Sequence, residues 1–379
     1  MNKYGIVTLY YNNYNCGGLL QALALQETVE KLGVICEQIA LDRTNAGNNF
    51  LHEAKRNNPF NRIKKIKNLP SKVMNLFYQD MYKIRINGYK KFQGEIPHSA
   101  NIYNLNSLSE LDSQYDGFIC GSDQIWNPYF CTEADFLRFS HKTKIAYAAS
   151  VGVTKLPLEV KKRYISYIDD FSAVSVREKN SVDLLSDSKN KIGYVVDPTF
   201  LLTKSDWEEK IPTTNYKNYA FVYFLGDSFH QRKIAKNIAK KSRKEILTFR
   251  HLKFSFRFSD LFFGENIHEF TPFDFISYIA NSDLVITDSF HAVVFSIIFG
   301  KQFYIINRFK DSDAESQNNR IADLLDKYEI GKRTISEINE EVEEINYDEV
   351  QSKVNIARTE SLEWLKGAIK EGKSDVGRL

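Results

Sequence analysis

The sequence of 379 residues lacks the patterns that mark metal-binding, disulfide-rich and membrane-spanning proteins. Its seven histidines form no HExxH pattern, and no run approaches the roughly 18 apolar residues that can cross a membrane. The first residues lead directly into a predicted strand, without the pattern of a signal peptide. The chain has four cysteines, Cys16, Cys36, Cys120 and Cys131. No two of them have the CxxC spacing, which argues against a zinc site and a disulfide framework. We therefore expect a reduced, cytoplasmic enzyme.

The overall charge is also small, because the formal net charge at pH 7 is only +3. A protein that binds nucleic acid usually carries a stronger basic excess, so we expect no nucleic-acid partner. Apolar residues make up 43% of the chain and aromatic residues 13%, a composition typical of a globular protein. The length is comfortable for two domains. We find no internal repeats and no low-complexity tract.

One segment departs from this balance. Residues 55–91 contain eleven lysines or arginines and a single acid, Asp80, so the rest of the chain is net acidic. Apolar residues recur at spacings of three and four, which predicts one or two amphipathic helices broken at Pro70. Such a helical insert, at about 50–95, can lie on an anionic membrane surface. The alternative is a helical hairpin packed on the domain, with its lysines in solvent.

The most informative stretch is 283–308. A short apolar strand at 284–286 is followed by Thr287-Asp288-Ser289, an apolar helix at 291–299 and a second strand at 303–306. Ligands of such βαβ units bind beyond the carboxyl ends of the strands, near helix N-termini that favour anions. Asp288, Ser289 and His291 fall in this zone, and Arg308 follows the next strand. The alternative is that Asp288 and Ser289 cap the helix and that His291 packs locally.

Three further predicted strands end in polar loops. The strand at 4–11 precedes Asn15, Gly17 and Gly18, where glycines allow close approach of the backbone, or simply form a tight turn. The strand at 115–121 precedes a loop with polar side chains, and such loops are a common place for binding residues. The strand at 173–176 precedes Arg177, which could bind a ligand or, as the alternative, form an ion pair with Glu178. The loop after 115–121 contributes Ser122, Asp123 and Gln124.

The remaining pattern predicts two successive α/β domains and a final helix. We expect an N-terminal domain at 1–210, a C-terminal domain at 211–345, and a helix in 346–379 that packs back on the first domain. Residues 250–269 are irregular and aromatic-rich, which suggests a flap. This flap contains His251, Arg257 and His268. Arg320 lies in the first turn of a predicted helix, where the helix dipole disfavours a cation, so we expect it to face a ligand or a carboxylate.

The chain resembles the polysaccharide pyruvyl transferase family in three motifs. Thr287-Asp288-Ser289-Phe290-His291 is similar to a Thr-x-Arg-Leu-His-like turn, with serine at the position of the arginine. Gly121-Ser122-Asp123-Gln124-Ile125-Trp126-Asn127 matches a Gly-Ser-Asp-Gln-x-Trp-Asn form. The loop at 12–21 resembles an Asn-Tyr-Gly-Gly-Leu-Leu-Gln-like stretch. This resemblance covers most of the chain from Tyr4 to about Leu325, apart from the basic insert.

The resemblance implies two Rossmann-like domains that face each other across a cleft, as in GT-B-like glycosyltransferases, with the acceptor on the N-terminal and the donor on the C-terminal domain. It also implies transfer of pyruvate from phosphoenolpyruvate to two hydroxyls of a sugar, without a metal or other cofactor. Arg177, Arg308 and Arg320 are then candidates for binding the donor's anionic groups. His291 is the candidate acid, and Asp123 the candidate base or sugar ligand.

The acceptor is expected to be a saccharide on a lipid diphosphate carrier, used in bacterial surface or capsule polysaccharide synthesis. The enzyme would then be peripheral on the inner face of the plasma membrane, with the basic insert near anionic lipid. Two alternatives stay open. One is a GT-B glycosyltransferase that uses a nucleotide sugar, and the other is a non-catalytic saccharide-binding assembly partner.

Overall fold

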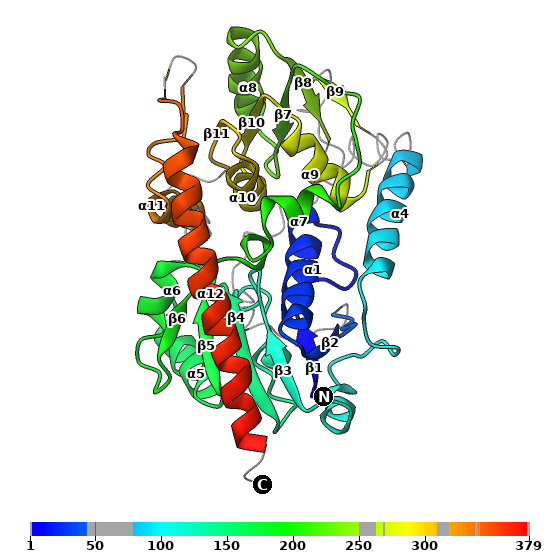
Figure 1. Cartoon of the computed structure of the whole chain (residues 1–379), viewed down its shortest axis with the longest axis vertical. Coiled ribbons are helices and arrows are strands. Elements are labelled where there is room, and N and C mark those ends of the chain that lie inside the picture. Colours follow the sequence, from blue (N-terminus) through cyan, green and yellow to red (C-terminus); the bar gives the residue numbers. More distant parts are fainter. Residues whose placement is uncertain are drawn as a thin grey trace, which may run out of the picture.

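The computed structural model describes residues 2–43, 50, 79–249, 263–267, 270–308, 318–337, 340 and 342–376. These residues form two parallel β-sheets, one above the other in Figure 1, with helices packed on both faces of each sheet. The expected pair of Rossmann-like α/β domains is therefore confirmed. Within the described residues, no helix combines the length and the apolar character needed to cross a membrane.

The first sheet has six strands in the order β2-β1-β3-β4-β5-β6. The strands are β1 (Lys3–Val7), β2 (Ile35–Gln38), β3 (Gly117–Cys120), β4 (Thr143–Ala149), β5 (Ala173–Val176) and β6 (Ile192–Tyr194). The connecting helices are α1 (Cys16–Lys31), α4 (Gln79–Glu95), η2 (Leu108–Ser113), η3 (Glu133–Phe136), α5 (Leu158–Ile168) and α6 (Lys179–Leu184). All neighbouring strands run parallel, so their carboxyl ends lie at one edge.

The second sheet has five parallel strands in the order β11-β10-β7-β8-β9. They are β7 (Tyr219–Tyr223), β8 (Glu245–Thr248), β9 (Glu265–Asn266), β10 (Leu284–Thr287) and β11 (Phe303–Ile305). The helices are α8 (Phe229–Lys241), α9 (Pro272–Ala280), α10 (Phe290–Phe299) and α11 (Asn318–Lys327). Between the sheets the chain passes through η4 (Pro198–Phe200) and α7 (Lys204–Glu208).

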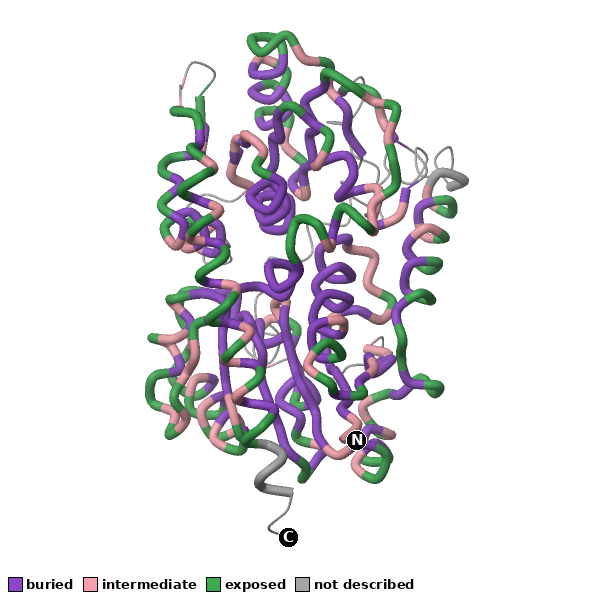
Figure 2. Tube along the Cα trace, viewed as in Figure 1, coloured by how far each residue is buried: buried purple, intermediate pink, exposed green. Residues whose placement is uncertain are grey.

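Successive side chains of each strand point to opposite faces of the sheet, and this divides the apolar interior into layers. In β3, Phe118 packs with α5 on one face of the first sheet, whereas Ile119 faces α1 on the other. In β7, Phe221 faces α9 and α10, whereas Val222 faces α8. The strands are buried on both faces (Figure 2), as expected for parallel sheets. The layer that contains α1, α9 and α10 is one continuous apolar cluster, so the two domains share part of their core.

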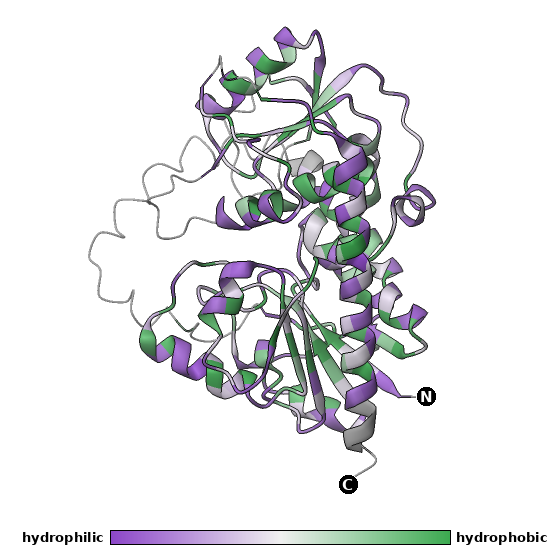
Figure 3. Ribbon diagram, turned by 60° about the vertical axis from the view of Figure 1, so that its left-hand side comes forward, coloured by the Kyte–Doolittle hydropathy of each residue, from purple (hydrophilic) through white to green (hydrophobic). Residues whose placement is uncertain are grey.

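The last helix, α12 (Tyr347–Val376), crosses from the second domain to the first (Figures 1 and 3). At its start the Tyr347 hydroxyl donates to the Lys301 carbonyl of the second domain. Farther along, the Ser361 hydroxyl accepts a hydrogen bond of 3.0 Å from the Val196 N–H of the first domain. One rigid helix therefore contacts both domains.

Most predicted helices and strands occur within a few residues of their expected bounds. The sequence patterns that predict β5 and α9 begin and end at the same residues as the observed elements. One expectation was wrong: the stretch 250–269 is not wholly irregular, because β9 pairs with β8 inside it. The last helix lies within the predicted range 346–379 and starts at Tyr347, where Asp348 and Glu349 suit the positive end of the helix dipole. Residues 51–78 of the basic insert lie outside the described residues, and its end forms α4.

The buried face of α12 gives a test of this arrangement. Leu365 is fully buried in the shared core, whereas Ile356 of the same helix is 58% exposed. We expect Leu365→Ala to destabilise the protein by about 2–5 kcal/mol, because the cavity remains after the side chain is removed. Ile356→Ala is the matched control and should change stability by at most about 0.5 kcal/mol. Thermal unfolding measures both, and equal midpoints for the two variants would contradict the packing of α12.

Candidate active site

Polar side chains from both domains meet where the carboxyl ends of the two sheets face one another. Asp123 follows β3 and Arg177 follows β5 in the first domain. Asp197, the N-cap residue of η4, also belongs to the first domain. His291 comes from the first turn of α10 in the second domain, directly after β10. The site is thus assembled from strand-end loops, as the sequence predicted for parallel sheets.

The carboxylate of Asp197 is the centre of this cluster and is only 3% exposed. Its Oδ1 accepts hydrogen bonds from the N–H and the hydroxyl of Thr199, at 3.0 and 2.7 Å. Its Oδ2 lies 2.5 Å from Nη1 of Arg177 and 3.7 Å from Nε2 of His291. Burial alone would raise the pKa of Asp197, but His291, Arg177 and the Thr199 N–H together hold it well below its ordinary value. Asp197 is therefore ionised.

His291 is held tightly between the two domains. Gly17, in the first turn of α1, packs against the imidazole so closely that an added Cβ would lie 2.0 Å from Nδ1. Only glycine fits at this contact. The Nε2 atom has no hydrogen-bond partner among the described residues. Oδ2 of Asp197 is close to it but lies about 0.5–1 Å beyond the usual hydrogen-bond distance. The ring is oriented by packing, with one nitrogen directed at the buried carboxylate.

Two arginines flank the ring of Phe290, the residue before His291. The guanidinium of Arg177 lies 4.5 Å from the centre of the ring and that of Arg320 lies 5.6 Å from it. Burial opposes the charge of Arg177, yet Glu178, Asp197 and Asp123 raise its pKa above the ordinary value. For Arg320 the same two effects, burial and neighbouring charges, together lower the pKa instead.

The pKa of Arg320 falls to about 10, first because of burial and then because of the neighbouring Arg177, with Arg308 adding a smaller effect. Glu178 and Asp123 offset this only in part. Burial of a second guanidinium beside Arg177 is therefore the main reason that the charged form of Arg320 is disfavoured.

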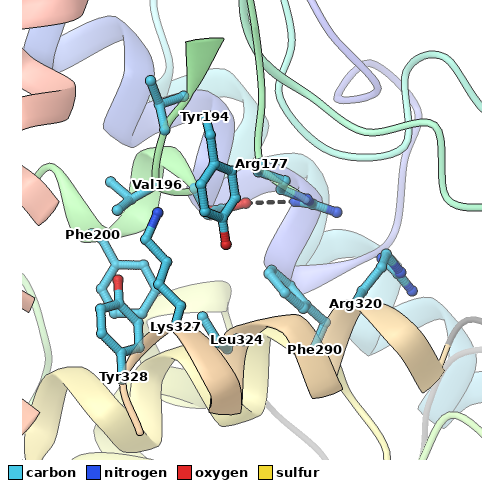
Figure 4. Close-up of a pocket in the computed structure, with 11 residues that line it drawn as sticks. Arg177, Tyr194, Val196, Phe200, Phe290, Arg320, Leu324, Lys327 and Tyr328 are labelled. Atoms are coloured by element: carbon cyan, nitrogen blue, oxygen red, sulfur yellow. Dashed lines mark hydrogen bonds and ion pairs between the residues drawn. The ribbon is translucent and has the colours of Figure 1, made fainter. Parts of the chain in front are cut away.

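A small pocket adjoins these groups (Figure 4). Phe290 lies in its wall, and the guanidinium groups of Arg177 and Arg320 point to the side of Phe290 away from Lys327. The pocket is lined by side chains from both domains: Arg177, Tyr194, Val195, Val196, Asp197, Phe200, Phe290, Arg320, Leu324, Lys327 and Tyr328.

The other predicted residues of the first domain support this cluster in different ways. Asp123 lies 3.5 Å from Nη2 of Arg177, with a side chain 14% exposed, so it remains accessible to a ligand. The Asn15 side chain caps α1 by accepting from the N–H groups of Gly17 and Gly18. Ser122 is fully buried, and its hydroxyl donates to the Ala148 carbonyl and lies 3.5 Å from Oδ2 of Asp197, so it supports the central carboxylate from below. Gln124 is half-buried and accepts from Asn127 at 2.8 Å.

Asp288 and Ser289 both have partners within the second domain, but only Ser289 caps α10 as the capping alternative supposed. The Asp288 carboxylate accepts from the N–H groups of Leu225 and Gly226, at 2.6 and 2.7 Å, and so fixes the loop after β7. Ser289 is the N-cap residue of α10. Arg308 lies near Asp288, and burial lowers its pKa. These three residues support the second domain around the site.

Sequence reasoning assigned no role to Asp197 or Phe290. The run Asp197-Pro198-Thr199 after a strand was a detectable signal for a cap, since Pro is favoured in the first turn and Asp before it. Its contact with His291 could not be predicted, because it depends on how the domains meet. His251, Arg257 and His268 lie outside the described residues. Within the described part of the chain, no three His, Cys, Asp or Glu side chains are grouped in a way that could hold a metal ion.

Comparison with known families decides the relationship. The sequence pattern of the family described as polysaccharide pyruvyl transferase matches residues 15–308, which is more than half of the chain. The chain belongs to the polysaccharide pyruvyl transferase family. The matched range includes the first turn of α1, the loop after β3, Asp197 and His291. No match was found among curated protein sequences.

The fold of this pyruvyl transferase family member is similar to that of several proteins of known structure. The structure of S. aureus MnaA with UDP gives a TM-score of 0.51 at 12% identity, covering 94% of this chain and 87% of that one. UDP-GlcNAc 2-epimerase from Methanocaldococcus jannaschii gives a TM-score of 0.50 at 10% identity, covering 93% and 99%. The structural neighbours have the GT-B fold, which agrees with the two parallel sheets of this chain. At this identity the likeness shows the fold alone.

The buried position of Asp197 leads to a pH-dependent prediction. Its folded pKa lies below the unfolded value of about 3.9, so its charge stabilises the fold above about pH 4 and this contribution is lost as the pH falls through the folded pKa. Asp197→Asn should cost roughly 3–5 kcal/mol at pH 7, or less where Glu178 and Asp123 still neutralise Arg177.

Thermal unfolding at pH 7 and pH 3 measures this difference. The loss of stability in Asp197→Asn, relative to the parent protein at the same pH, should be smaller at pH 3 than at pH 7. Asp187→Asn is the control, because Asp187 forms an ion pair at the surface with a side chain 66% exposed. A deficit of equal size at both pH values would show that the charge of Asp197 is not what stabilises the site.

Proposed function

We propose that this member of the family transfers pyruvate from phosphoenolpyruvate to two hydroxyls of one sugar, forming a cyclic ketal and releasing phosphate. The observation that supports the proposal is the meeting of two buried arginines, Arg177 and Arg320, with His291 at the facing ends of the two sheets. Phosphoenolpyruvate needs cations for its carboxylate and phosphate, and it needs an acid for its methylene carbon. The cluster contains both kinds of group.

In the proposed reaction, His291 donates a proton to the methylene carbon, which becomes the methyl group, while C2 gains positive character. The first sugar hydroxyl adds its oxygen to C2 and gives its proton to Asp123. Phosphate then leaves with the electrons of its C–O bond. The second hydroxyl adds to C2 and its proton restores His291, while the proton on Asp123 passes to phosphate. Asp197 lies 3.7 Å from Nε2 of His291, so its carboxylate would face the positive charge whenever the imidazole carries the second proton.

The arginine of the family motif is replaced by Ser289, so its charge must come from elsewhere. Arg320 approaches Phe290 from α11 and Arg177 approaches it from β5. An anion with about three negative charges cannot enter a buried site without such partners. The lowered pKa of Arg320 supports this assignment, because a bound anion would remove the mutual repulsion of the arginines. Arg308 is a more distant source of charge.

We further propose a lipid-linked saccharide as the acceptor and peripheral contact with an anionic membrane. The support is the sequence of the basic insert and the exposed face of α4 at its end. That face carries Lys83, Lys90 and Lys91 together with Ile84, which is 40% exposed. Basic residues near an anionic surface contribute about 1 kcal/mol each. The opposite face of α4 packs on the second domain, where Arg85 donates to the Ile267 carbonyl at 2.5 Å.

Kinetics of two variants test the roles of the cluster. His291→Gln should keep donor binding and lower kcat by roughly 10²–10⁴, since it removes the proton donor. Arg320→Lys should mainly raise KM for phosphoenolpyruvate, because lysine lacks the planar fork that binds carboxylate or phosphate through two hydrogen bonds. His230→Gln, an exposed histidine of α8, is the control.

Thermal shift with phosphoenolpyruvate and with UDP-sugars separates this function from that of a glycosyltransferase. Stabilisation by UDP-sugars alone would favour the glycosyltransferase alternative. An active His291→Gln variant with the parent kcat would remove His291 from the mechanism.

Co-sedimentation with vesicles tests membrane contact. The parent protein should bind vesicles that contain anionic lipid, and binding should weaken as salt shortens the Debye length below about 10 Å. Changing Lys64, Lys65 and Lys67 to Glu should reduce binding, whereas the same change at exposed Lys189, Lys233 and Lys240 should have little effect. A parent protein that stays in the supernatant at low salt would exclude the proposed contact.

A further inference from the structure

The loop that carries Asp123 is held by a side chain of α1 that has no part in the proposed reaction. Gln21 lies in the second turn of α1 and is fully buried. Its Oε1 accepts a hydrogen bond of 3.0 Å from the Ser122 N–H. Its Nε2 donates to the Thr8 hydroxyl, at 2.9 Å, and to the Gly18 carbonyl, at 2.8 Å. One amide group therefore joins the end of β1, the first turn of α1 and the loop after β3.

This support matters because Asp123 has an uncommon backbone conformation. Its φ is +48°, in the left-handed region that residues with a side chain seldom adopt. Such a conformation persists where contacts on both sides determine the path of the chain. Before it, the Ser122 N–H is bonded to Gln21, and after it the Asp123 carbonyl accepts from the Ser150 N–H at 3.0 Å. The direction of the Asp123 side chain depends on these two hydrogen bonds.

The same glutamine also fixes the surface against which the Asp123 carboxylate lies. A Cβ added at Gly18 would be 3.4 Å from Oδ2 of Asp123, so the first turn of α1 lies directly beside this oxygen. The other oxygen, Oδ1, is 3.5 Å from Nη2 of Arg177. Because Gln21 is bonded both to Gly18 and to the residue before Asp123, it sets the spacing between α1 and the carboxylate.

We propose that Gln21 is a positioning residue, which holds the Asp123 carboxylate where it can accept the proton of the first sugar hydroxyl. This role rests on the function proposed above, since Gln21 performs no chemistry itself and acts only through Asp123. A displacement of about 1 Å in a reacting group can cost roughly 10²-fold in rate. The rival role of Gln21 is to join α1 to the sheet, which would affect stability without a specific effect on Asp123.

Amide hydrogen exchange on the full chain tests the contact without any substrate. In Gln21→Met, whose side chain has a similar length, the Ser122 N–H loses its acceptor and should exchange roughly 10-fold faster. The Gly121 N–H is the internal control, because it donates to the Val7 carbonyl and should change little. Unchanged exchange at Ser122, or an equal increase at both amides, would overturn the proposal and leave the proposed reaction untouched.

Phosphate release from phosphoenolpyruvate, with methyl glycosides of hexoses as acceptors, tests the action through Asp123. Gln21→Met should lower kcat by roughly 10- to 100-fold in the parent protein. In Asp123→Asn the same change should have an effect of less than about 3-fold, because no carboxylate is left to position. Asparagine also tolerates a left-handed backbone, so the loop keeps its path.

Gln38→Met is the matched control for these rates. Gln38 is also a fully buried glutamine, and it joins β2 to α1 by donating to the Ala22 carbonyl at 2.9 Å. Its loss should leave kcat near the parent value. Thr8→Val serves if Gln21→Met does not fold, because it has a similar shape and removes one partner of Nε2. It should lower kcat by a smaller factor than Gln21→Met, again in the parent background only.

Two kinetic results would contradict the positioning role. Equal losses of kcat in the parent and Asp123→Asn backgrounds, or an equal loss in Gln38→Met, would show that Gln21 acts on the fold in general. An Asp123→Asn variant with the parent kcat would remove Asp123 from the proposed reaction and end the role of Gln21 with it, even if Ser122 exchanges faster. Hydrogen exchange thus separates a failure of the contact from a failure of the proposed function.

Discussion

The arrangement of the site depends on one buried carboxylate. Asp197 is removed from water and yet ionised, so it requires polar partners, and besides the Ser122 hydroxyl at 3.5 Å these come from three elements. The start of η4 satisfies one oxygen through Thr199, while β5 supplies Arg177 and α10 supplies His291 to the other. The first two contacts lie within the N-terminal domain. The third crosses to the other domain, so the position of His291 depends on how the domains are joined.

Several features of the chain hold that junction in place. Gly17 lets α1 approach the His291 ring more closely than any other residue would allow. The apolar cluster that runs from α1 through α9 and α10 is continuous, and α12 adds hydrogen bonds to both domains. A shared apolar core resists relative motion more than a polar interface does. The small gap of 3.7 Å between Asp197 and His291 is thus the result of packing along the whole junction.

The sequence predicted the fold well and the site in part. Buried strands such as β10 and β5 are short β-branched runs that end in polar residues, so their ends were visible in the sequence. His291, Asp123 and Arg177 could be found because each follows such a strand. Asp197 could not be assigned a role, because its partners are distant in the chain and its pattern indicates only a cap. Asp288 and Ser289 have the same chemistry as ligand-binding residues, and only their contacts with backbone N–H groups show a structural role.

The replacement of the family arginine by Ser289 illustrates how charge can move within one site. Serine caps α10, which an arginine side chain cannot do, and so the first turn of that helix is stabilised locally. In our proposal the cation lies on α11 instead, at Arg320, where burial, the neighbouring Arg177 and the helix dipole all oppose its charge. A folded protein tolerates such an arrangement when a ligand restores the balance, or when nearby carboxylates do so in part. Glu178 and Asp123 partly offset the effect of this burial on the pKa of Arg320. Arg177 and Arg320 both lie against the ring of Phe290, so an anion bound there, as we propose for the donor, would meet both guanidinium groups.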